Sequence, residues 1–428
     1  MTTVNVGVIG YGTIGTGVVR ILQKDAALLE KRSGRPIALK TVAELHPTPR
    51  EGIDASRFAL TDDALSVCRD PDIHIVVEVI GGVQPARQFI EEALRNGKHV
   101  ITANKELMAK HGRELLVLAH EHNVNLGFEA SVGGGIPIIN ALTSSLAGNR
   151  FARIYGILNG TTNYILTRMY NDGVDFDAVL QEAQALGYAE ADPSSDVDGH
   201  DIAYKLCLLA TIAFDTFFDI NEIFREGIRS ITARDIAVAK EFGYVIKILA
   251  VGVQRGDTDV ELRVHPVMIP TRHPLASVND AFNAVFVEGE NVGESMFYGR
   301  GAGELPTASA IMGDMVEIVR TLALQRSGMA SRFGGSTHRI RPMGDIESRY
   351  YLRLKVADAP GVLGAIAQAF GQQEVSIRSV KQQEGDGTAA ELIIMTHAVR
   401  EARMQAALTD IRALPTVDEV CSLIRVGL

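Results

Sequence analysis

The sequence predicts an α/β protein with a doubly wound parallel sheet at its N-terminus, an α+β domain in the middle and a βαββαβ unit at its C-terminus. Three observations support this prediction. An apolar strand runs into a glycine-rich turn and a helix, strands and helices then alternate as far as residue 103, and strand, helix, strand, strand, helix and strand follow residue 350. The length of 428 residues fits roughly three domains of about 150 residues each.

Composition and charge are those of a globular protein. Hydrophobic residues make up 46% of the chain and charged residues 22%, as in an average globular domain. The net charge of −10 argues against nucleic acid as a partner, because phosphates attract a basic surface. The longest apolar run covers residues 206–214, whereas a membrane-spanning helix needs about 20 residues. No basic region precedes the apolar N-terminal stretch, so we expect a cytoplasmic protein with no membrane partner.

The glycines at residues 10–15 lie between the first strand, residues 4–9, and a helix pattern that follows at once. Gly10 permits a tight turn, Gly12 lets the backbone approach a pyrophosphate, and Gly15 lets the helix pack on the strand. The phosphates would bind at the helix N-terminus. This order predicts a Rossmann-type dinucleotide-binding domain, and the alternative is a glycine-rich turn that holds no ligand.

Glu44 bears on the choice of cofactor. It follows the predicted second strand, residues 38–43, where an acidic side chain would accept a hydrogen bond from a ribose 2′-OH and favour NAD. Arg50 lies close enough in sequence to bind the 2′-phosphate of NADP instead. An ordinary exposed glutamate is a third interpretation, so the sequence leaves the choice between NAD and NADP open.

Lys105 follows another predicted strand of the same sheet. Residues 73–80 and 99–103 are read as buried strands separated by a helix at residues 85–96. Residues 81–82 and 104–105 then lie at the carboxyl ends of these strands, where open α/β sheets bind ligands. Lys105 is a candidate site residue on this ground, against the alternative of a solvated surface lysine.

The middle of the chain contains a dense acidic segment. A glycine turn at residues 131–137 marks the crossing into a new domain, and residues 159–163 are typical of a helix N-cap. Residues 187–205 then combine five acids with a single lysine. Asp201 and Lys205 are spaced i, i+4 on one face of an apolar helix, where a lysine is costly to bury unless it is paired or functional. Lys205 could donate a proton to a developing alkoxide, while Glu190 and Asp201 bind a substrate ammonium group. A solvated acidic loop is the alternative.

These segments together resemble the homoserine dehydrogenase family. The resemblance rests on residues 10–15, the Thr-Ala-Asn-Lys segment 102–105, residues 159–163 and above all residues 183–205, and it extends from residue 1 to about residue 320. It implies reversible NAD(P)H-dependent reduction of L-aspartate 4-semialdehyde to L-homoserine, in threonine, methionine and isoleucine biosynthesis. Lys205 would be the catalytic proton donor and Lys105 a second active-site lysine. The residues that hold the amino acid would be Gly187, Glu190 and Asp201.

The resemblance also implies cofactor and cation contacts. Those to the cofactor would come from Gly10, Gly12, Thr13, Ile14, Gly15, Glu44, Ala103, Lys105 and Gly303. A monovalent cation, Na⁺ or K⁺ with Na⁺ favoured, would be held by Glu129 and by the backbone carbonyls of Val132, Gly134 and Ile136. Ala43 stands before Glu44 where many members have a basic residue, which weakens an inference of strict NADP preference.

The C-terminal part begins after a polar, glycine-bearing stretch at residues 326–349, which is read as a linker. The predicted βαββαβ order beyond it is ferredoxin-like. The turn at residues 358–363 resembles that of an ACT domain, a module that binds small amino acids and pairs its sheets edge to edge. An effector, for which the pathway suggests threonine, would bind at Asp358, Gly361, Val362 and Leu363. A pure dimerisation unit is the alternative, and we expect a homodimer or homotetramer.

The predicted domains are therefore a nucleotide-binding domain at 1–130, a catalytic and dimerisation domain at 131–325 whose residues 301–325 return to the first domain, the linker, and an ACT domain at 350–428. The length leaves no room for a fused aspartate kinase, so we expect a monofunctional enzyme. One rival is a reductase of another amino-acid semialdehyde or a cyclic imine, which has no need of the acidic segment. A non-catalytic amino-acid sensor is the other, and Lys105 and Lys205 argue against it.

Overall fold

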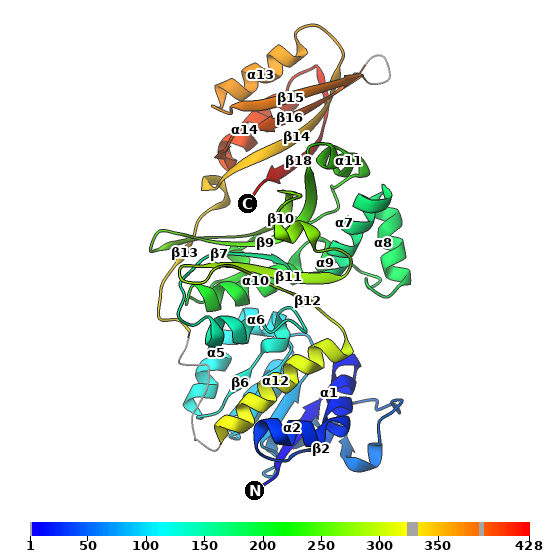
Figure 1. Cartoon of the computed structure of the whole chain (residues 1–428), viewed down its shortest axis with the longest axis vertical. Helices are drawn as coiled ribbons and strands as arrows, with labels where there is room; N and C mark the ends of the chain where they lie inside the picture. Colours follow the sequence, from blue (N-terminus) through cyan, green and yellow to red (C-terminus); the bar gives the residue numbers. More distant parts are fainter. Residues whose placement is uncertain (1, 323–332, 385–388) are drawn as a thin grey trace. The chain divides into compact units, whose positions relative to one another are not determined.

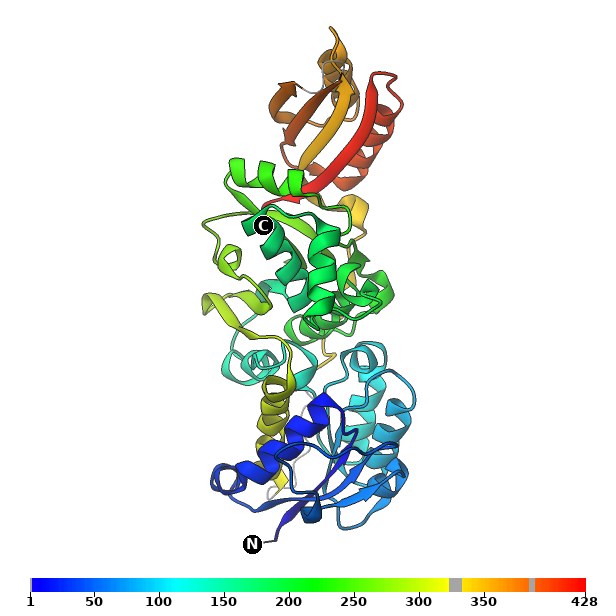
Figure 2. The same cartoon turned by 90° about the vertical axis from the view of Figure 1, so that its right-hand side faces the viewer.

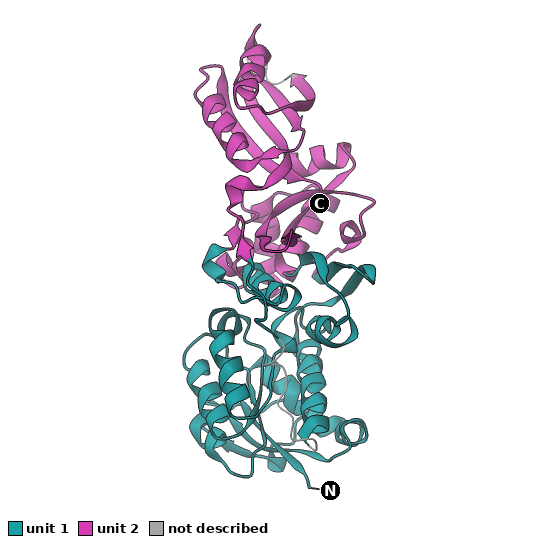
Figure 3. Cartoon of the chain, turned by 90° about the vertical axis from the view of Figure 1, so that its left-hand side faces the viewer, with its two compact units in different colours: residues 1–158, 201–222, 282–338 teal, residues 159–200, 223–281, 339–428 magenta. Residues whose placement is uncertain are grey.

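The computed structural model describes residues 2–322, 333–384 and 389–428. The chain forms two compact units, here called unit 1 (residues 1–158, 201–222 and 282–338) and unit 2 (residues 159–200, 223–281 and 339–428), shown in Figure 3. Of the predicted linker, residues 326–332 lie outside the described residues. Across the described ranges, no helix has the length and apolar character needed to cross a membrane.

Unit 1 begins with a six-stranded parallel sheet of order β3-β2-β1-β4-β5-β6. Its strands are β1 (Val4–Ile9), β2 (Ile37–Ala43), β3 (Ala59–Thr61), β4 (Ile75–Glu78), β5 (His99–Thr102) and β6 (Leu126–Gly127). From β1 the chain winds outward first to one side and then, from β4, to the other, which confirms the predicted doubly wound sheet. Ligands of such sheets bind at the carboxyl ends of the two strands where the winding reverses, here β1 and β4.

Helices cover both faces of this sheet (Figure 2). They are α1 (Thr13–Lys24), α2 (Ala26–Ser33), α3 (Ala64–Arg69), α4 (Ala86–Arg95), α5 (Lys105–Glu121) and, from much later in the chain, α12 (Glu304–Leu322). Val18 of α1 and Ile311 of α12 join Val6 and Val8 of β1 in one buried core. The two helices approach closely at Gly17, where a Cβ atom would lie 2.8 Å from the backbone oxygen of Glu304.

The rest of unit 1 contains a mostly buried helix and three antiparallel strands. Its elements are α6 (Ile138–Asn140), β7 (Phe151–Ile157), α10 (His200–Ala213), β11 (Phe282–Gly289) and β12 (Gly293–Arg300). Strand β11 pairs with both β7 and β12. Helix α10 is apolar over most of its length and buries Lys205 together with Asp201.

Unit 2 combines helices with a sheet of order β9-β10-β18-β14-β16-β15. Its helices are α7 (Gly160–Asp172), α8 (Phe176–Ala185), α9 (Ser194–Val197), α11 (Ala233–Glu241), α13 (Val362–Gln372) and α14 (Glu401–Arg412). Its strands are β8 (Phe224–Arg225), β9 (Tyr244–Arg255), β10 (Asp259–Pro270), β13 (Arg339–Ile340), β14 (Glu347–Ala357), β15 (Ile377–Glu384), β16 (Ala389–Thr396), β17 (Val399–Arg400) and β18 (Val417–Val426).

The C-terminal part of unit 2 has the predicted βαββαβ order. Strands β18, β14, β16 and β15 form an antiparallel sheet, and α13 and α14 lie on one of its faces (Figure 1). Ile366 of α13 and Leu408 of α14 pack against Leu352 and Leu354 of β14. Strand β18 extends beyond this sheet and pairs in parallel with β10 through Val267 and Arg425. The βαββαβ order and the two helices on one face of the antiparallel sheet confirm the ferredoxin-like prediction.

Candidate active site

Asp201 joins two lysines near the start of α10. Its Oδ2 accepts a hydrogen bond of 2.6 Å from Lys205, one helical turn further on, and its Oδ1 lies 3.0 Å from the Nζ of Lys105. Lys205 also donates to the backbone oxygen of Leu158, just after β7, over 2.7 Å. The structure therefore brings Lys105, which lies far away in sequence, together with the predicted pair Asp201 and Lys205.

Burial differs sharply between the two lysines. The Lys205 side chain is 10% exposed and that of Asp201 6%, whereas the Lys105 side chain is 43% exposed. A buried ammonium group needs a compensating carboxylate, which Asp201 supplies. Because Lys105 and Lys205 carry two positive charges against one negative charge, this trio is net positive and suits an oxyanion that forms beside it.

A buried hydrogen-bond network fixes the backbone in front of Lys105. Glu78, at the end of β4, accepts from the hydroxyl of Thr102 over 2.7 Å, and this hydroxyl accepts from the backbone N–H of Asn104. Asn104 caps α5 by accepting from the N–H of Leu107. Burial raises the pKa of Glu78, which is fully buried. Glu78 is not among the residues predicted from the sequence, although an acid inside an apolar strand is a usable signal.

The glycine turn has the geometry of a phosphate-binding site. Gly10 has φ +103°, and a Cβ atom at Gly15 would lie 2.0 Å from the Gly10 oxygen. Gly12 opens onto free space and precedes α1 without a side-chain cap, so the first N–H groups, from Thr13 and Ile14 onward, are left for a ligand. The buried hydroxyl of Thr16 has no hydrogen-bond partner among the described residues. These features fit a dinucleotide pyrophosphate.

Glu44 and Arg50 both contact Tyr11 within this turn. Glu44 accepts from the Tyr11 N–H over 2.8 Å, and this bond lowers the pKa of Glu44. Arg50 donates to the Tyr11 oxygen over 2.7 Å and lies over its ring. Both candidates for reading the ribose are thus fixed at the turn.

Two further predicted cofactor contacts also lie in unit 1. Ala103 follows β5 directly. Gly303 has φ +117° and immediately precedes α12, whose Glu304 pairs with Arg20 of α1 over 2.9 Å. Gly303 therefore lies near α1, the helix that begins at the glycine turn.

The predicted cation site lies in a buried loop. Glu129 is 2% exposed, and its two carboxylate oxygens accept from the N–H groups of Ile139 and Asn140 over 2.8 and 2.6 Å. Burial raises the pKa of Glu129 to about 7. The loop that contains Val132, Gly134 and Ile136 is buried at those three positions. Each carboxylate oxygen can accept more than one partner, so this side chain is compatible with a cation in the same loop.

The remaining predicted substrate residues belong to unit 2. Gly187 has φ +74° and Glu190 is exposed; both lie between α8 and α9. Asn159 caps α7 as predicted, and its amide also donates to Asp196 over 2.7 Å. The acidic segment is therefore held at Asp196 rather than being a freely solvated loop.

The predicted effector residues surround the start of α13. Gly361 has φ +90° and leaves the helix without a side-chain cap. Asp358 is exposed, Val362 is buried in the core, and Leu363 is 41% exposed. Uncapped N–H groups at a helix start are suited to a carboxylate.

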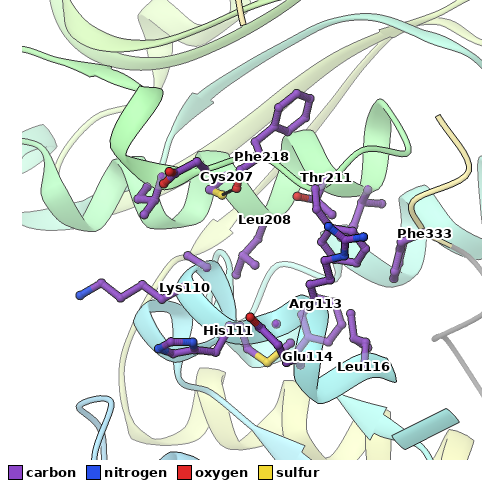
Figure 4. A pocket seen from close by; sticks show the side chains of 18 of the residues that line it. Lys110, His111, Arg113, Glu114, Leu116, Cys207, Leu208, Thr211, Phe218 and Phe333 are labelled. Atoms are coloured by element: carbon purple, nitrogen blue, oxygen red, sulfur yellow. Dashed lines mark hydrogen bonds between the residues drawn. The ribbon is translucent and has the colours of Figure 1, made fainter. Parts of the chain in front are cut away.

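A cavity of about 570 Å³ lies further along α5 and α10 in unit 1 (Figure 4). Its wall includes Arg113, Cys207, Leu208, Thr211 and Phe333. None of the predicted site residues belongs to the described residues that line it. The cavity is therefore separate from the Lys105–Asp201–Lys205 trio.

Comparison with known proteins identifies the family. Residues 137–316 match the family described as homoserine dehydrogenase, residues 10–129 match the homoserine dehydrogenase NAD binding domain, and residues 350–416 match the ACT domain. The homoserine dehydrogenase of Synechocystis is 44% identical, and the alignment covers 99% of each chain. The chain belongs to the homoserine dehydrogenase family.

Solved homoserine dehydrogenases have the same fold. The Thiobacillus denitrificans enzyme matches with a TM-score of 0.93 and 40% identity, over 99% of this chain and 98% of that one. A hyperthermophilic archaeal homoserine dehydrogenase in complex with NADPH matches with a TM-score of 0.62 and 26% identity, over 75% of this chain and 98% of that one. As a homoserine dehydrogenase, the protein is an oxidoreductase that acts on a CH–OH group and has an NAD(P)-binding domain.

Proposed function

We propose that Lys205 is the proton donor when this enzyme reduces L-aspartate 4-semialdehyde to L-homoserine. The observation that supports this role is the pairing of a nearly buried ammonium group with Asp201 and the Leu158 oxygen. NAD(P)H supplies the hydride when it is bound. Lys205 gives a proton to the oxygen of the former aldehyde, and in the reverse direction it takes that proton from the homoserine hydroxyl.

Asp201 and Lys105 complete the proposed site. Asp201 holds the Lys205 ammonium group in one orientation, because its Oδ2 lies on the same helix face one turn away. Lys105 adds a second positive charge beside the developing alkoxide and is exposed enough to touch cofactor or substrate. Glu190 and Asp201, with the turn at Gly187, would bind the substrate ammonium group.

We propose the glycine turn and its neighbours as the cofactor site. The uncapped start of α1 would bind the pyrophosphate, with contacts from Ala103 and Gly303. Glu44 and Arg50 both contact Tyr11 in the turn. Glu44 would recognise the ribose 2′-OH of NAD, and Arg50 would recognise the 2′-phosphate of NADP. The archaeal relative's NADPH supports the use of NADP by at least one family member.

We propose that a monovalent cation, Na⁺ in preference to K⁺, occupies the loop formed by Glu129 and the carbonyls of Val132, Gly134 and Ile136. The buried carboxylate supports this proposal, because burial raises its pKa to about 7 and a bound cation would offset the cost of its charge. NaCl should raise the melting temperature of the wild type more than that of Glu129→Gln, with choline chloride as the ionic-strength control.

We propose threonine as an effector that binds at Asp358, Gly361, Val362 and Leu363. The uncapped start of α13 supports a ligand carboxylate there. A melting temperature that does not change with saturating threonine would contradict this assignment. The homodimer or homotetramer, the cytoplasmic location and the domain boundaries at residues 130, 325 and 349 stay predictions.

The Lys205 assignment is tested by Lys205→Met. We expect the initial rate of L-homoserine oxidation to fall at least about 100-fold, while NADPH still binds, as followed by its fluorescence. Lys110→Met, which removes an exposed lysine of α5, is the matched control and should keep wild-type turnover. Wild-type turnover by Lys205→Met would refute the proposed role.

A further inference from the structure

The acidic segment that precedes α10 is held by a second segment of unit 2. This segment, residues 226–229, follows β8 and is here called the clamp. Its Ile228 N–H donates to the backbone oxygen of Val197 over 2.9 Å. A Cβ atom at Gly227 would lie only 2.2 Å from the same oxygen, so the close approach requires glycine.

Arg229 adds a bidentate ion pair to the clamp. Its Nε and Nη2 donate to the two carboxylate oxygens of Asp198 over 2.6 and 3.1 Å, and Nη2 also donates to the hydroxyl of Ser194. Two parallel hydrogen bonds fix the direction of the carboxylate as well as its position. The clamp therefore fixes α9 and the residues up to Gly199, which lead directly into the helix that bears Asp201 and Lys205.

The other side of the clamp is attached to the ACT domain. Arg425 of β18, with a side chain 5% exposed, donates to Glu226 over 2.7 Å. The same guanidinium donates twice to Glu401 at the start of α14, over 3.0 and 2.9 Å. Glu226 is also attached to strand β10, because its backbone N–H donates to the Val264 oxygen over 2.8 Å.

We infer that Glu226 and Arg229 are positioning residues for substrate, and that the Arg425–Glu226 ion pair is the connection through which the ACT domain acts on substrate affinity. This inference rests on the proposed function, because it assumes that the segment around Glu190 and Asp201 binds the substrate ammonium group. The contacts run without interruption from Glu401 through Arg425 and Glu226 to Val197 and Asp198. A displacement of β18 therefore pulls on the acidic segment as far as Asp198, within unit 2.

The alternative is a purely structural role, and the exposure of the Arg229–Asp198 pair makes the two roles separable. The side chains are 47% and 36% exposed, and exposed ion pairs contribute little to stability. Arg229→Ala should therefore shift the melting temperature by no more than about 2 °C. Removal of a positioning contact should instead raise the KM for L-homoserine about tenfold and change kcat less than about twofold.

The experiment compares Arg229→Ala, Arg229→Lys, Glu226→Gln and the double variant in steady-state kinetics and thermal melts. In Arg229→Lys the rise in KM should be smaller than in Arg229→Ala. In the double variant Arg229→Ala/Glu226→Gln, the fold-increase in KM should be smaller than the product of the increases in the two single variants, because both residues act on one segment. Arg69→Ala, which removes a comparable exposed pair with Glu92 in the nucleotide-binding domain, should leave KM unchanged.

Two outcomes would overturn the inference. One is an unchanged KM in both single variants, and the other is a KM effect that is fully multiplicative in the double variant. Lys205→Met measured in the same assay separates these outcomes from a failure of the proposed function. A collapse of turnover in that variant with no effect of the clamp variants rejects the clamp alone, whereas wild-type turnover by Lys205→Met rejects the catalytic assignment.

Discussion

Asp201 and Lys205 lie one turn apart on α10, with 2.6 Å between Oδ2 and Nζ and with each side chain at most a tenth exposed. A buried pair of this kind is not in itself strong evidence for stability, but loss of one partner leaves the other charge uncompensated. The pair therefore ties the proposed proton donor to its anionic partner, and changes at Asp201 should affect catalysis and folding together.

Asp201→Asn should reduce kcat for homoserine oxidation about 100-fold and lower the melting temperature by several degrees, because Lys205 loses its buried counter-charge. Asp172→Asn is the control, since Asp172 forms an i, i+4 pair with Arg168 on α7 but is 44% exposed. Its melting temperature and kcat should stay close to wild type. Equal effects of the two substitutions would argue against a special role for Asp201.

Gly15→Ala should abolish tight nucleotide binding, because the new Cβ atom would collide with the Gly10 oxygen and displace the start of α1. Isothermal titration with NADPH measures this loss. Gly313→Ala places the same methyl group in α12, where, apart from the nearby backbone of its own helix and its two chain neighbours, no atom of the described residues lies within 4 Å, and this variant should bind NADPH like the wild type. Normal affinity in Gly15→Ala would contradict a phosphate site at this turn.

Glu44→Gln should raise the ratio of kcat/KM for NADP to that for NAD about tenfold, because a carboxylate repels a 2′-phosphate and the amide does not. The amide oxygen can still accept from the Tyr11 N–H, so the turn is preserved. Glu30→Gln, an exposed position on α2, is the control. A constant ratio would remove Glu44 as the selector.

His99 should make unfolding sensitive to acid. Burial, helped by His74, lowers its pKa to about 4, and its Nδ1 accepts from the Asn125 N–H. The unfolded chain takes up this proton below about pH 6.5 and the folded chain does not, so stability falls as the pH drops from 6.5 to 4, by at most about 3 kcal/mol.

Urea unfolding of wild type and His99→Gln at pH 7 and pH 4.5 measures this effect. The difference in free energy of unfolding between them should be larger at pH 7, because the variant lacks the titrating group. Exposed His122→Gln is the control. A difference that is the same at both pH values would show that His99 titrates equally in the folded and unfolded states.

Local patterns in the sequence predicted much of this architecture. Apolar periodicity located β1, β2, β4 and β5 of the N-terminal sheet and the four main strands of the ACT domain, but it did not indicate β3, β6 or the strands in the middle of the chain. The strand predicted at residues 73–80 is only Ile75–Glu78, because apolar residues continue past the end of the ladder. The i, i+4 spacing was enough to place Asp201 beside Lys205. Lys205 also contacts the Leu158 oxygen, and Lys105 contacts Asp201. Both contacts join residues far apart in the chain, and periodicity contains no information about such contacts.

The clamp shows a second limit of such patterns. Gly227 is an isolated glycine whose need for a close backbone approach appears only once Val197 lies beside it. Arg425 lies in an apolar strand and is balanced by Glu226 and Glu401 from two other elements. A charged residue inside an apolar run, such as Arg425 or Glu78, can be recognised from the sequence alone. The sequence does not show which residue will balance its charge.

The late arrival of α12 has a consequence for synthesis on the ribosome. Strand β1 and helix α1 bury Val8 and Val18 against Ile311 and Met315, which are translated long after β6 has emerged. Because synthesis proceeds at about 5–20 residues per second, this apolar face stays exposed for on the order of ten seconds or more before α12 is made. The nascent N-terminal unit is therefore a natural client for chaperones, and a fragment that ends at β6 should aggregate where the full-length chain does not.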